Sequence, residues 1–320
     1  MFWRKSGVWG LLTGCLSAPL FITSALGVVG PAREAPGFAP YVVMVLDSSE
    51  GVEEASYCTA SILSPDTVLT AAHCVDSPGS THVFFSTGDT HPYLILTAWI
   101  GSILLAMLLA LLANKAWHIR PATTLQAFLS LVLLASALAY YSFKAASAKL
   151  TFFEIASIAI HPDYRPSGGG DTESVDLALL RLAKPLPQKF TPVEWRDPLP
   201  VKPGQRVELA GFGRAAAIKG NSQKVLRSAI LAVGSLVSPQ RVELIDPNGS
   251  GLGGCTGDSG APIFEPGAAR LLAVAISARG DHGFYCGGGT QAVLVGPQLP
   301  WIDSVLAAWR KAPKGKPERI

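Results

Sequence analysis

Residues 254–262 read GCTGDSGAP and place a serine, Ser259, in a glycine-rich turn. The glycines on both sides permit a sharp bend, so that the backbone N–H groups of Gly257 and Ser259 can converge on one oxygen atom. A serine hydroxyl becomes an effective nucleophile when a neighbouring base takes its proton. Taken alone, these nine letters also fit an ordinary turn, so the chemistry depends on what the rest of the chain supplies.

Two further motifs supply the missing groups. The stretch TAAHC at 70–74 presents His73 beside a cysteine, and DLALLRL at 176–182 presents Asp176 at the head of an apolar strand. Amide hydrolysis at a serine needs a base for the hydroxyl proton and a carboxylate that fixes the tautomer of that base. Each motif alone has an ordinary structural interpretation. Their joint occurrence predicts a catalytic triad of His73, Asp176 and Ser259, with the N–H groups of Gly257 and Ser259 as the oxyanion hole.

With these residues, the chain resembles the trypsin/chymotrypsin-type serine protease family over residues 28–88 and 150–311. Further motifs agree with the resemblance: VVGP at Val28, PY from Pro40, HPDY at 161–164 and GFG at 211–213. The resemblance implies an all-β fold of two six-stranded antiparallel β-barrels, chymotrypsin-like, with the active site between them. It also implies a protein or peptide substrate and no cofactor. The family's calcium loop would lie near residues 89–150, where an apolar insertion replaces it, so we expect no metal.

The start of the domain follows from the same resemblance. It makes Val28 the mature N-terminus, whose ammonium would form a buried ion pair with Asp258, the residue before the nucleophile. Because we find no separate propeptide before Val28, we expect that cleavage of an export signal after Gly27 creates the active enzyme. The letters VVG could instead be the end of the apolar leader.

The substrate pocket departs from the family pattern. Six residues before Ser259, where trypsin-like members hold an acid, the chain has Gly253, so cleavage after Lys or Arg is not favoured. ISARG at 276–280 resembles the pocket wall, with Ser277 near the triad and Arg279 where the family usually has glycine. Arg279 could narrow the cleft, pair with an acidic substrate group or point into solvent. The substrate preference therefore stays open.

The cysteines point to an oxidising compartment. The chain has five, and no pair shows the CxxC spacing of zinc or redox sites. Cys15 lies in the leader, and the remaining four fit two disulfides. The family resemblance pairs Cys58 with Cys74 and Cys255 with Cys286.

The composition separates this chain from an ordinary soluble domain. Charged residues make up 15% of its 320 residues and hydrophobic residues 49%, whereas a soluble domain has roughly 25% charged residues. A net charge of +3, with no basic stripe, argues against a nucleic-acid partner. Part of the chain is therefore expected to lie outside water.

Residues 1–27 have the pattern of a signal peptide. Arg4 and Lys5 precede a long uncharged stretch, and Ala25 and Gly27 provide small residues at a cleavage site. Two other interpretations are open. LTGC could make Cys15 a lipid attachment point, or the leader could stay as a membrane anchor.

Two uncharged stretches, 92–113 and 121–143, interrupt the protease-like sequence between His73 and Asp176. Each exceeds the roughly 20 helical residues that cross a bilayer core of about 30 Å. Two crossings return the chain to the side from which it came, so both halves of the protease could meet outside. The connection Asn114–Arg120 carries two basic residues and is expected to be cytoplasmic. The alternatives are a water-soluble helical insertion packed on the barrel and an artefact of the gene sequence.

These observations divide the chain into four parts. Residues 1–27 are a signal peptide, and residues 28–89 and 150–311 form a protease domain. Residues 90–149 are an inserted α-helical transmembrane hairpin, and residues 312–320 are a basic tail. Apolar residues at helical spacing in 300–311 predict a C-terminal helix at the end of the protease domain. We expect a membrane-tethered, exported serine endopeptidase on the periplasmic or extracellular side. The alternative is a membrane scaffold whose hairpin binds a partner membrane protein, with a regulated or inactive protease-like domain.

Overall fold

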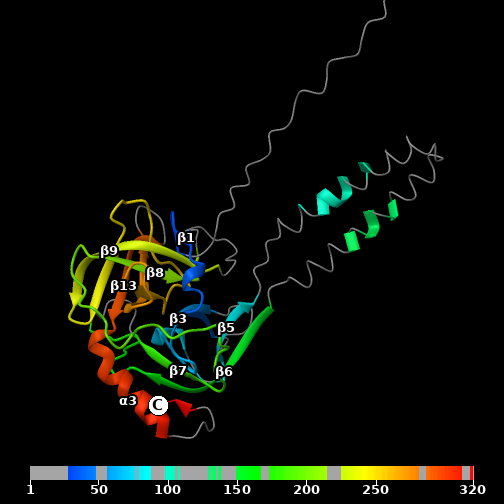
Figure 1. Ribbon diagram of the computed structural model, residues 1–320. Helices are drawn as coiled ribbons and strands as arrows, with labels where there is room; N and C mark the ends of the chain where they lie inside the picture. Colours follow the sequence, from blue (N-terminus) through cyan, green and yellow to red (C-terminus); the bar gives the residue numbers. More distant parts are fainter. Residues whose placement is uncertain are drawn as a thin grey trace, which may run out of the picture.

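The computed structural model describes residues 28–47, 56–75, 77, 79–87, 149–166, 173–214, 225–280, 286–311 and 318–319, with short pieces between 97 and 137. The predicted signal peptide, residues 1–27, lies outside the described residues. The described strands build two β-barrels, and a helix packs at the C-terminal end (Figure 1).

The first barrel is a sheet of six antiparallel strands in the order β6-β5-β2-β3-β4-β7, closed by pairing of β6 with β7. Its long strand β6 serves two neighbours, because residues 149–154 pair with β5 and residues 155–160 pair with β7. The 3-10 turn η2 (Ala72–Cys74) follows β4 and carries His73. The strands are β2 (Val42–Asp47), β3 (Ser56–Ser64), β4 (Thr67–Thr70), β5 (Thr81–Thr87), β6 (Lys149–Ile160) and β7 (Ala178–Leu182).

The second barrel has the order β9-β10-β13-β12-β11-β8 and is closed by pairing of β9 with β8. Two-residue strands extend the edges, β1 (Arg33–Glu34) along β9 and β14 (Glu318–Arg319) along β6 of the first barrel. The two closed six-stranded barrels confirm the chymotrypsin-like part of the predicted fold. The strands are β8 (Arg206–Gly211), β9 (Arg227–Ser238), β10 (Arg241–Ile245), β11 (Pro262–Phe264), β12 (Leu271–Gly280) and β13 (Gly287–Leu294).

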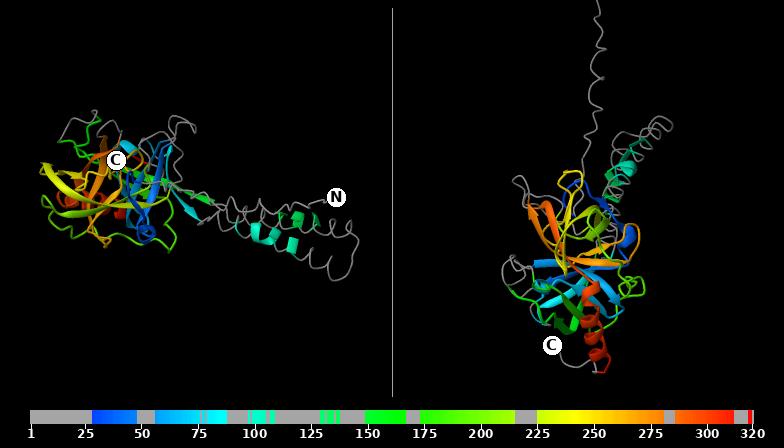
Figure 2. Two further views of the ribbon diagram at one scale, coloured as in Figure 1. Left: turned by 90° about the horizontal axis from the view of Figure 1, so that it is seen from above. Right: turned by 90° about the vertical axis from the view of Figure 1, so that its left-hand side faces the viewer.

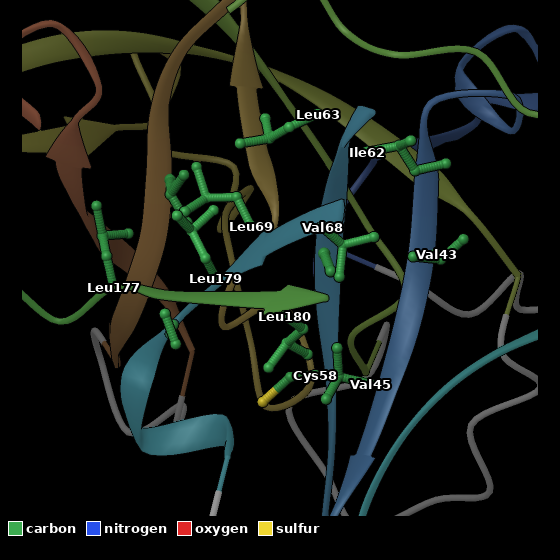
Figure 3. Packing of buried hydrophobic residues seen from close by; sticks show 14 of the residues in the cluster. Val43, Val45, Cys58, Ile62, Leu63, Val68, Leu69, Leu177, Leu179 and Leu180 are labelled. Carbon is green, nitrogen blue, oxygen red and sulfur yellow. The ribbon is translucent and has the colours of Figure 1, made fainter. Parts of the chain in front are cut away.

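One hydrophobic core spans both barrels. Strand β4 is buried along its whole length, and β7 is buried except at Arg181. Figure 3 shows Val68 and Leu69 of β4 packed against Leu179 and Leu180 of β7. Both faces of these strands are covered, which suits the largely apolar sequence ALLRL of β7 and buries Thr67 and Thr70 of β4 as well. The same cluster includes residues of the second barrel, so the barrels are packed against each other rather than joined only by the chain.

The C-terminal helix α3 (Leu299–Lys311) follows the short turn η3 (Gly296–Gln298) and confirms the predicted helix. Ile302 and Trp309 are buried in the common core, and Trp301 lies edge-on to the ring of His161, with ring centroids 4.7 Å apart. The basic tail is described only at Glu318–Arg319, which pair in parallel with β6. A third 3-10 turn, η1 (Pro36–Phe38), precedes β2.

The predicted insertion leaves the first barrel at the tip of one hairpin. Strands β5 and β6 are antiparallel neighbours, and Thr87 lies opposite Lys149, so residues 88–148 form one loop between them. Lys149, which the prediction placed in the insertion, is the first residue of β6. The insertion therefore interrupts a turn and no strand of the barrel.

The predicted transmembrane hairpin, 90–149, lies for the most part outside the described residues, but its described pieces are helical. They are residues 97, 99–104, 107–108, 129–130, 132–134 and 136–137. The indole N–H of Trp99 donates a hydrogen bond to Ser136 Oγ at 3.2 Å, so the two segments lie side by side, away from the barrels (Figure 2). Leu104 is 56% exposed and Leu133 is 71% exposed. Within the described pieces, no helix reaches the length and apolar character needed to cross a bilayer.

Candidate active site

Asp176 holds His73 with both oxygens of its carboxylate. Nδ1 of His73 lies 2.6 Å from Asp176 Oδ2, and the backbone N–H of His73 donates to Oδ1 at 3.0 Å. A carboxylate at Nδ1 favours the tautomer that carries its proton there, which leaves Nε2 able to accept one. The ring is partly exposed while the carboxylate is largely covered. The structure therefore places the predicted base beside the predicted orienting carboxylate.

A buried arginine of the second barrel braces the segment before Asp176. Arg241, at the start of β10, donates from Nη2 to the carbonyl of Ser174. Ser174 Oγ in turn accepts the backbone N–H of Arg165 at 2.9 Å. Arg241 is 6% exposed. Sequence reasoning missed it, because an arginine at the start of a strand does not indicate a partner 67 positions away.

Ser259 lies in a tight loop of the second barrel, between two glycines with positive φ. Gly257 has a φ of 97° and Gly260 a φ of 80°. Inside the loop, the N–H of Ala261 donates to the carbonyl of Asp258 at 2.9 Å. Among the described residues, the N–H groups of Gly257 and Ser259 have no hydrogen-bond acceptor. Both N–H groups are therefore free to donate to a further acceptor, and their role as an oxyanion hole stays a prediction.

The loop of residues 257–260, called the nucleophile loop after the predicted role of Ser259, packs on the first barrel by direct backbone contact. A Cβ at Gly260 would lie 2.1 Å from the carbonyl oxygen of Thr59 and 2.2 Å from Thr70 Oγ1. A Cβ at Gly257 would lie 2.6 Å from the ring of Tyr57. Side chains do not fit at these distances, so both positions require glycine for space as well as for φ.

Strand β3 connects Ser259 to the His73 side of the site. The N–H of Thr59 donates to the carbonyl of Ser259 at 2.8 Å. The preceding residue, Cys58, forms a disulfide with Cys74, the neighbour of His73. A hydrogen bond from the Ser259 hydroxyl to His73 is not among the contacts of the described residues. Such bonds are often long in ligand-free enzymes and tighten when substrate binds.

The structure forms two disulfides, Cys58–Cys74 and Cys255–Cys286, with Cα–Cα distances of 6.1 and 5.1 Å. By loop-entropy estimates, each stabilises the domain by about 3 kcal/mol. Cys58, His73 and Cys74 also bring three ligand-type atoms within 4.8 Å of one another. Both sulfurs are bonded to each other, so this cluster lacks the thiolates that a metal would need.

Val28 and Val29 dock against the second barrel. Val28 is buried in its core, and Val29 pairs with Gly253 through backbone hydrogen bonds of 3.0 and 3.2 Å. Arg227 donates from Nη1 to the carbonyl of Val28 at 3.0 Å and from Nη2 to that of Ala32. In the intact chain the nitrogen of Val28 belongs to a peptide bond. The predicted ion pair can therefore form only after cleavage.

Asp258 is a buried carboxyl group beside Ser259. Its oxygens accept the N–H of Gly213 at 2.8 Å and the N–H of Cys255 at 2.9 Å. Burial raises the pKa of Asp258 to about 7, although both N–H groups and the charge of Arg227 act to lower it. A Cβ at Gly213 would lie 2.3 Å from this carboxylate, which explains the glycines of the GFG motif. A cation delivered to this site would stabilise the charged form.

Gly253, predicted to lie in the substrate pocket, packs against backbone and one hydroxyl. A Cβ at Gly253 would lie 3.3 Å from Gly287 Cα and 3.4 Å from Thr290 Oγ1. Thr290 is buried, and its hydroxyl accepts the N–H of Gly254 at 2.9 Å. Sequence reasoning missed Thr290, because the stretch after Cys286 gave no alignable motif.

The predicted pocket wall lies in β12. Ser277 is exposed and pairs with Gln291 of β13. The backbone of Arg279 lies in the same strand, opposite Gly289. The two positions are thus two residues apart on the strand that runs past the nucleophile loop, where Ala275 accepts the N–H of Gly260 at 2.7 Å.

Two closed barrels with a C-terminal helix define a chymotrypsin-like serine protease domain. The trypsin family model matches residues 28–93 and 137–301 of this chain. The match covers more than half of the chain and includes both barrels, so the chain belongs to the trypsin family.

The proteins similar to this chain include an inhibitor, a serine protease and an inactivated protease. Glucanase inhibitor protein 4 of Phytophthora infestans is 30% identical over 145 residues, which are 42% of this chain and 54% of that protein. The chain thus spans about half the length of this curated relative. Mouse neuropsin, a serine protease, is 19% identical with a TM-score of 0.56, covering 86% of this chain and 99% of that one. An inactivated protease paralogue of the scabies mite is 20% identical, with the same TM-score and coverage. At these identities the solved structures show the fold alone.

The crowding at Gly260 predicts a large and local cost of substitution. Gly260 and Gly267 have similar φ angles of 80° and 76°, but a Cβ at Gly267 would meet nothing within 4 Å. In Gly267→Ala the free energy of unfolding should therefore fall by only about 1–2 kcal/mol, the cost of placing an alanine in the left-handed region. In Gly260→Ala the free energy of unfolding should fall by at least about 2 kcal/mol more, because the added carbon overlaps the first barrel. Denaturant unfolding of both variants with disulfides intact measures the difference, and equal losses would contradict the described packing.

Proposed function

We propose that this protein is an exported, membrane-tethered serine endopeptidase with Ser259 as its nucleophile. The observation that carries the proposal is the double contact of Asp176 with His73, in a domain whose fold presents Ser259 on a glycine-rich loop. Membership of the trypsin family supports a hydrolase acting on proteins or peptides.

The proposed reaction has two steps, acylation and deacylation of Ser259, and both use the same groups. Ser259 Oγ attacks the peptide carbonyl carbon while its proton passes to Nε2 of His73, and Asp176 stabilises the resulting imidazolium. The N–H groups of Gly257 and Ser259 bind the oxygen that becomes negative. His73 then protonates the leaving amine, and the acyl group stays on Ser259 as an ester. A water molecule that gives its proton to His73 hydrolyses this ester and restores the hydroxyl.

The pocket favours a substrate residue without a positive charge. Gly253 provides no carboxylate at the floor, and the groups nearest to it are the backbone of Gly287 and the hydroxyl of Thr290. Burying an unpaired Lys or Arg head group against such a floor would be unfavourable. These features argue against cleavage after Lys or Arg.

Backbone strain at Val28 supports cleavage after Gly27. Val28 has a φ of 29°, which a β-branched residue rarely adopts and which costs about 1–3 kcal/mol. This torsion is defined only while a residue precedes Val28. Cutting the peptide bond after Gly27 therefore removes the strain and frees an ammonium, which is proposed to pair with Asp258.

The two apolar segments support the membrane tether. They carry no charge, they lie side by side through the Trp99–Ser136 hydrogen bond, and their described leucines are exposed. An aqueous protein seldom leaves such a patch uncovered. Both ends of the loop meet at Thr87 and Lys149, so the tether would hold the barrel by two connections.

A second candidate function is partner binding without proteolysis. It is favoured by the names of two similar proteins, a glucanase inhibitor and an inactivated protease. In this alternative the barrels, or the hairpin, bind a partner, and Ser259 is not acylated. The retained His73–Asp176 contact argues for the enzyme.

Labelling with a fluorophosphonate separates the two candidates. The wild-type chain should be labelled covalently, and Ser259→Ala and His73→Ala should lose the label. Asp176→Asn should slow labelling by about ten-thousandfold, because the imidazole would be left in the wrong tautomer. Ser304→Ala, which removes an exposed serine of the C-terminal helix α3 outside the proposed site, serves as the control and should keep the label. A folded wild-type protein that takes up no label favours partner binding.

The state of Val28 is tested by comparing cleaved and uncleaved chains. N-terminal sequencing of the labelled wild-type protein should begin at Val28. Replacing Ala25 and Gly27 by leucine removes the small residues that cleavage needs. In this uncleaved form, the raised pKa of Asp258 makes the free energy of unfolding fall as pH rises from about 4 to 7. The cleaved form should show a weaker dependence, and identical pH profiles would rule out the ion pair.

The tether is tested by excising residues 88–148. Because Thr87 and Lys149 are opposite each other, an Asn-Gly turn can join them and keep the β5–β6 pairing. The shortened enzyme should leave the membrane fraction and still be labelled, whereas the wild type should stay with membranes after an alkaline wash. A shortened chain that begins at Val28 and still sediments with membranes would show that the insertion is not the tether.

A further inference from the structure

Thr59 of β3 is a buried polar residue that the proposed mechanism does not use. It is fully buried, at 0% exposure. Its hydroxyl donates to the carbonyl of Gly257 at 2.8 Å, across a sequence separation of 198 positions. Its backbone N–H donates to the carbonyl of Ser259 at 2.8 Å. One residue of the first barrel thus contacts both residues whose N–H groups form the proposed oxyanion hole.

The direction of these hydrogen bonds is fixed by the chemistry of the partners. The Thr59 hydroxyl accepts the N–H of Phe212 at 3.1 Å, and that N–H can only donate. The carbonyl of Gly257 can only accept, so it receives the hydroxyl proton. Thr70 holds Thr59 from the other side, because Thr70 Oγ1 donates to its carbonyl at 2.8 Å. The hydroxyl therefore links β3, the GFG loop and the nucleophile loop in a single arrangement.

Gly257 needs an anchor of this kind. A glycine at a φ of 97° has other conformations available at little cost, so the direction of its N–H is not fixed by the residue itself. The ring of Tyr57 closes one side, where a Cβ would lie at 2.6 Å. The hydrogen bond from Thr59 restrains the carbonyl at the other end of the same residue.

We propose that Thr59 is a positioning residue for the oxyanion hole, holding the Gly257 carbonyl so that the Gly257 N–H points at the developing negative charge. The inference rests on the proposed function, and Thr59 acts through Gly257 without touching the reacting atoms. Removing an oxyanion donor outright slows an enzyme by roughly 10²–10³-fold. Loosening one should slow labelling by a smaller factor, about 10–100-fold.

The test compares side chains that differ in the hydroxyl alone. Thr59→Ser and Thr59→Ala both remove the methyl group, but only serine keeps the hydroxyl, and Thr59→Val keeps the shape without it. Each full-length variant, purified in detergent, is labelled with a fluorophosphonate across a range of pH, and the rate is taken per folded molecule. Thr59→Ser should stay within about threefold of wild type. Thr59→Ala and Thr59→Val should reach a plateau about 10–100-fold lower with an unchanged pH midpoint, because His73 is not affected.

Thr67→Val is the matched control. Thr67 is also buried in the first barrel, at 3% exposure, and its hydroxyl faces Asp66 rather than the nucleophile loop. The variant Thr67→Val should have a lower free energy of unfolding and an unchanged labelling rate. Equal rates for Thr59→Ser and Thr59→Ala, or an equal loss in Thr67→Val, would overturn the positioning role. If neither Thr59→Ala nor Thr59→Val folds, Thr59 is a structural residue and the proposal falls. A folded wild type without label would overturn the proposed function itself.

Discussion

The hydrogen bond from the N–H of Thr59 to the carbonyl of Ser259 joins the two barrels at the proposed nucleophile. It connects two backbones directly, so it depends on how closely the loop can approach β3. Gly260 permits that approach, because any side chain there would overlap Thr59 and Thr70. The rest of the site depends on this contact, since it sets the distance between a serine on one barrel and a histidine on the other.

The groups of the site are divided unequally between the barrels. His73 and Asp176 both belong to the first barrel, where η2 and the segment before β7 hold them within 2.6 Å of each other. Ser259, Gly257 and Asp258 all belong to one loop of the second barrel. Each half lies on a closed barrel. The packing between barrels, with Arg241 and Thr59 crossing it, therefore determines whether the halves fit together.

The motifs of the site were predictable from sequence, and its supporting contacts were not. Ser259, His73 and Asp176 stand in short stretches whose letters indicate their chemistry. The barrels followed from resemblance, and the apolar insertion from excess length between His73 and Asp176. Thr59 and Arg227 gave no signal, because their partners lie 198 and 199 positions away. A threonine in an apolar strand also looks like any other residue with β-propensity. Local patterns indicate chemistry, whereas contacts between distant segments depend on how the barrels pack.

The place of the insertion also has a consequence for folding. Strands β5 and β6 would ordinarily be joined by a short turn, but here about sixty residues separate Thr87 from Lys149. Each doubling of a flexible loop costs about 0.6 kcal/mol of closure entropy, so pairing these strands would be harder by roughly 2 kcal/mol. If the two apolar segments associate first, through contacts such as Trp99 with Ser136, their outer ends are already close together. In that case the association of the two segments offsets part of the closure entropy. Strands β5 and β6 then pair after the insertion has folded, and the first barrel closes last.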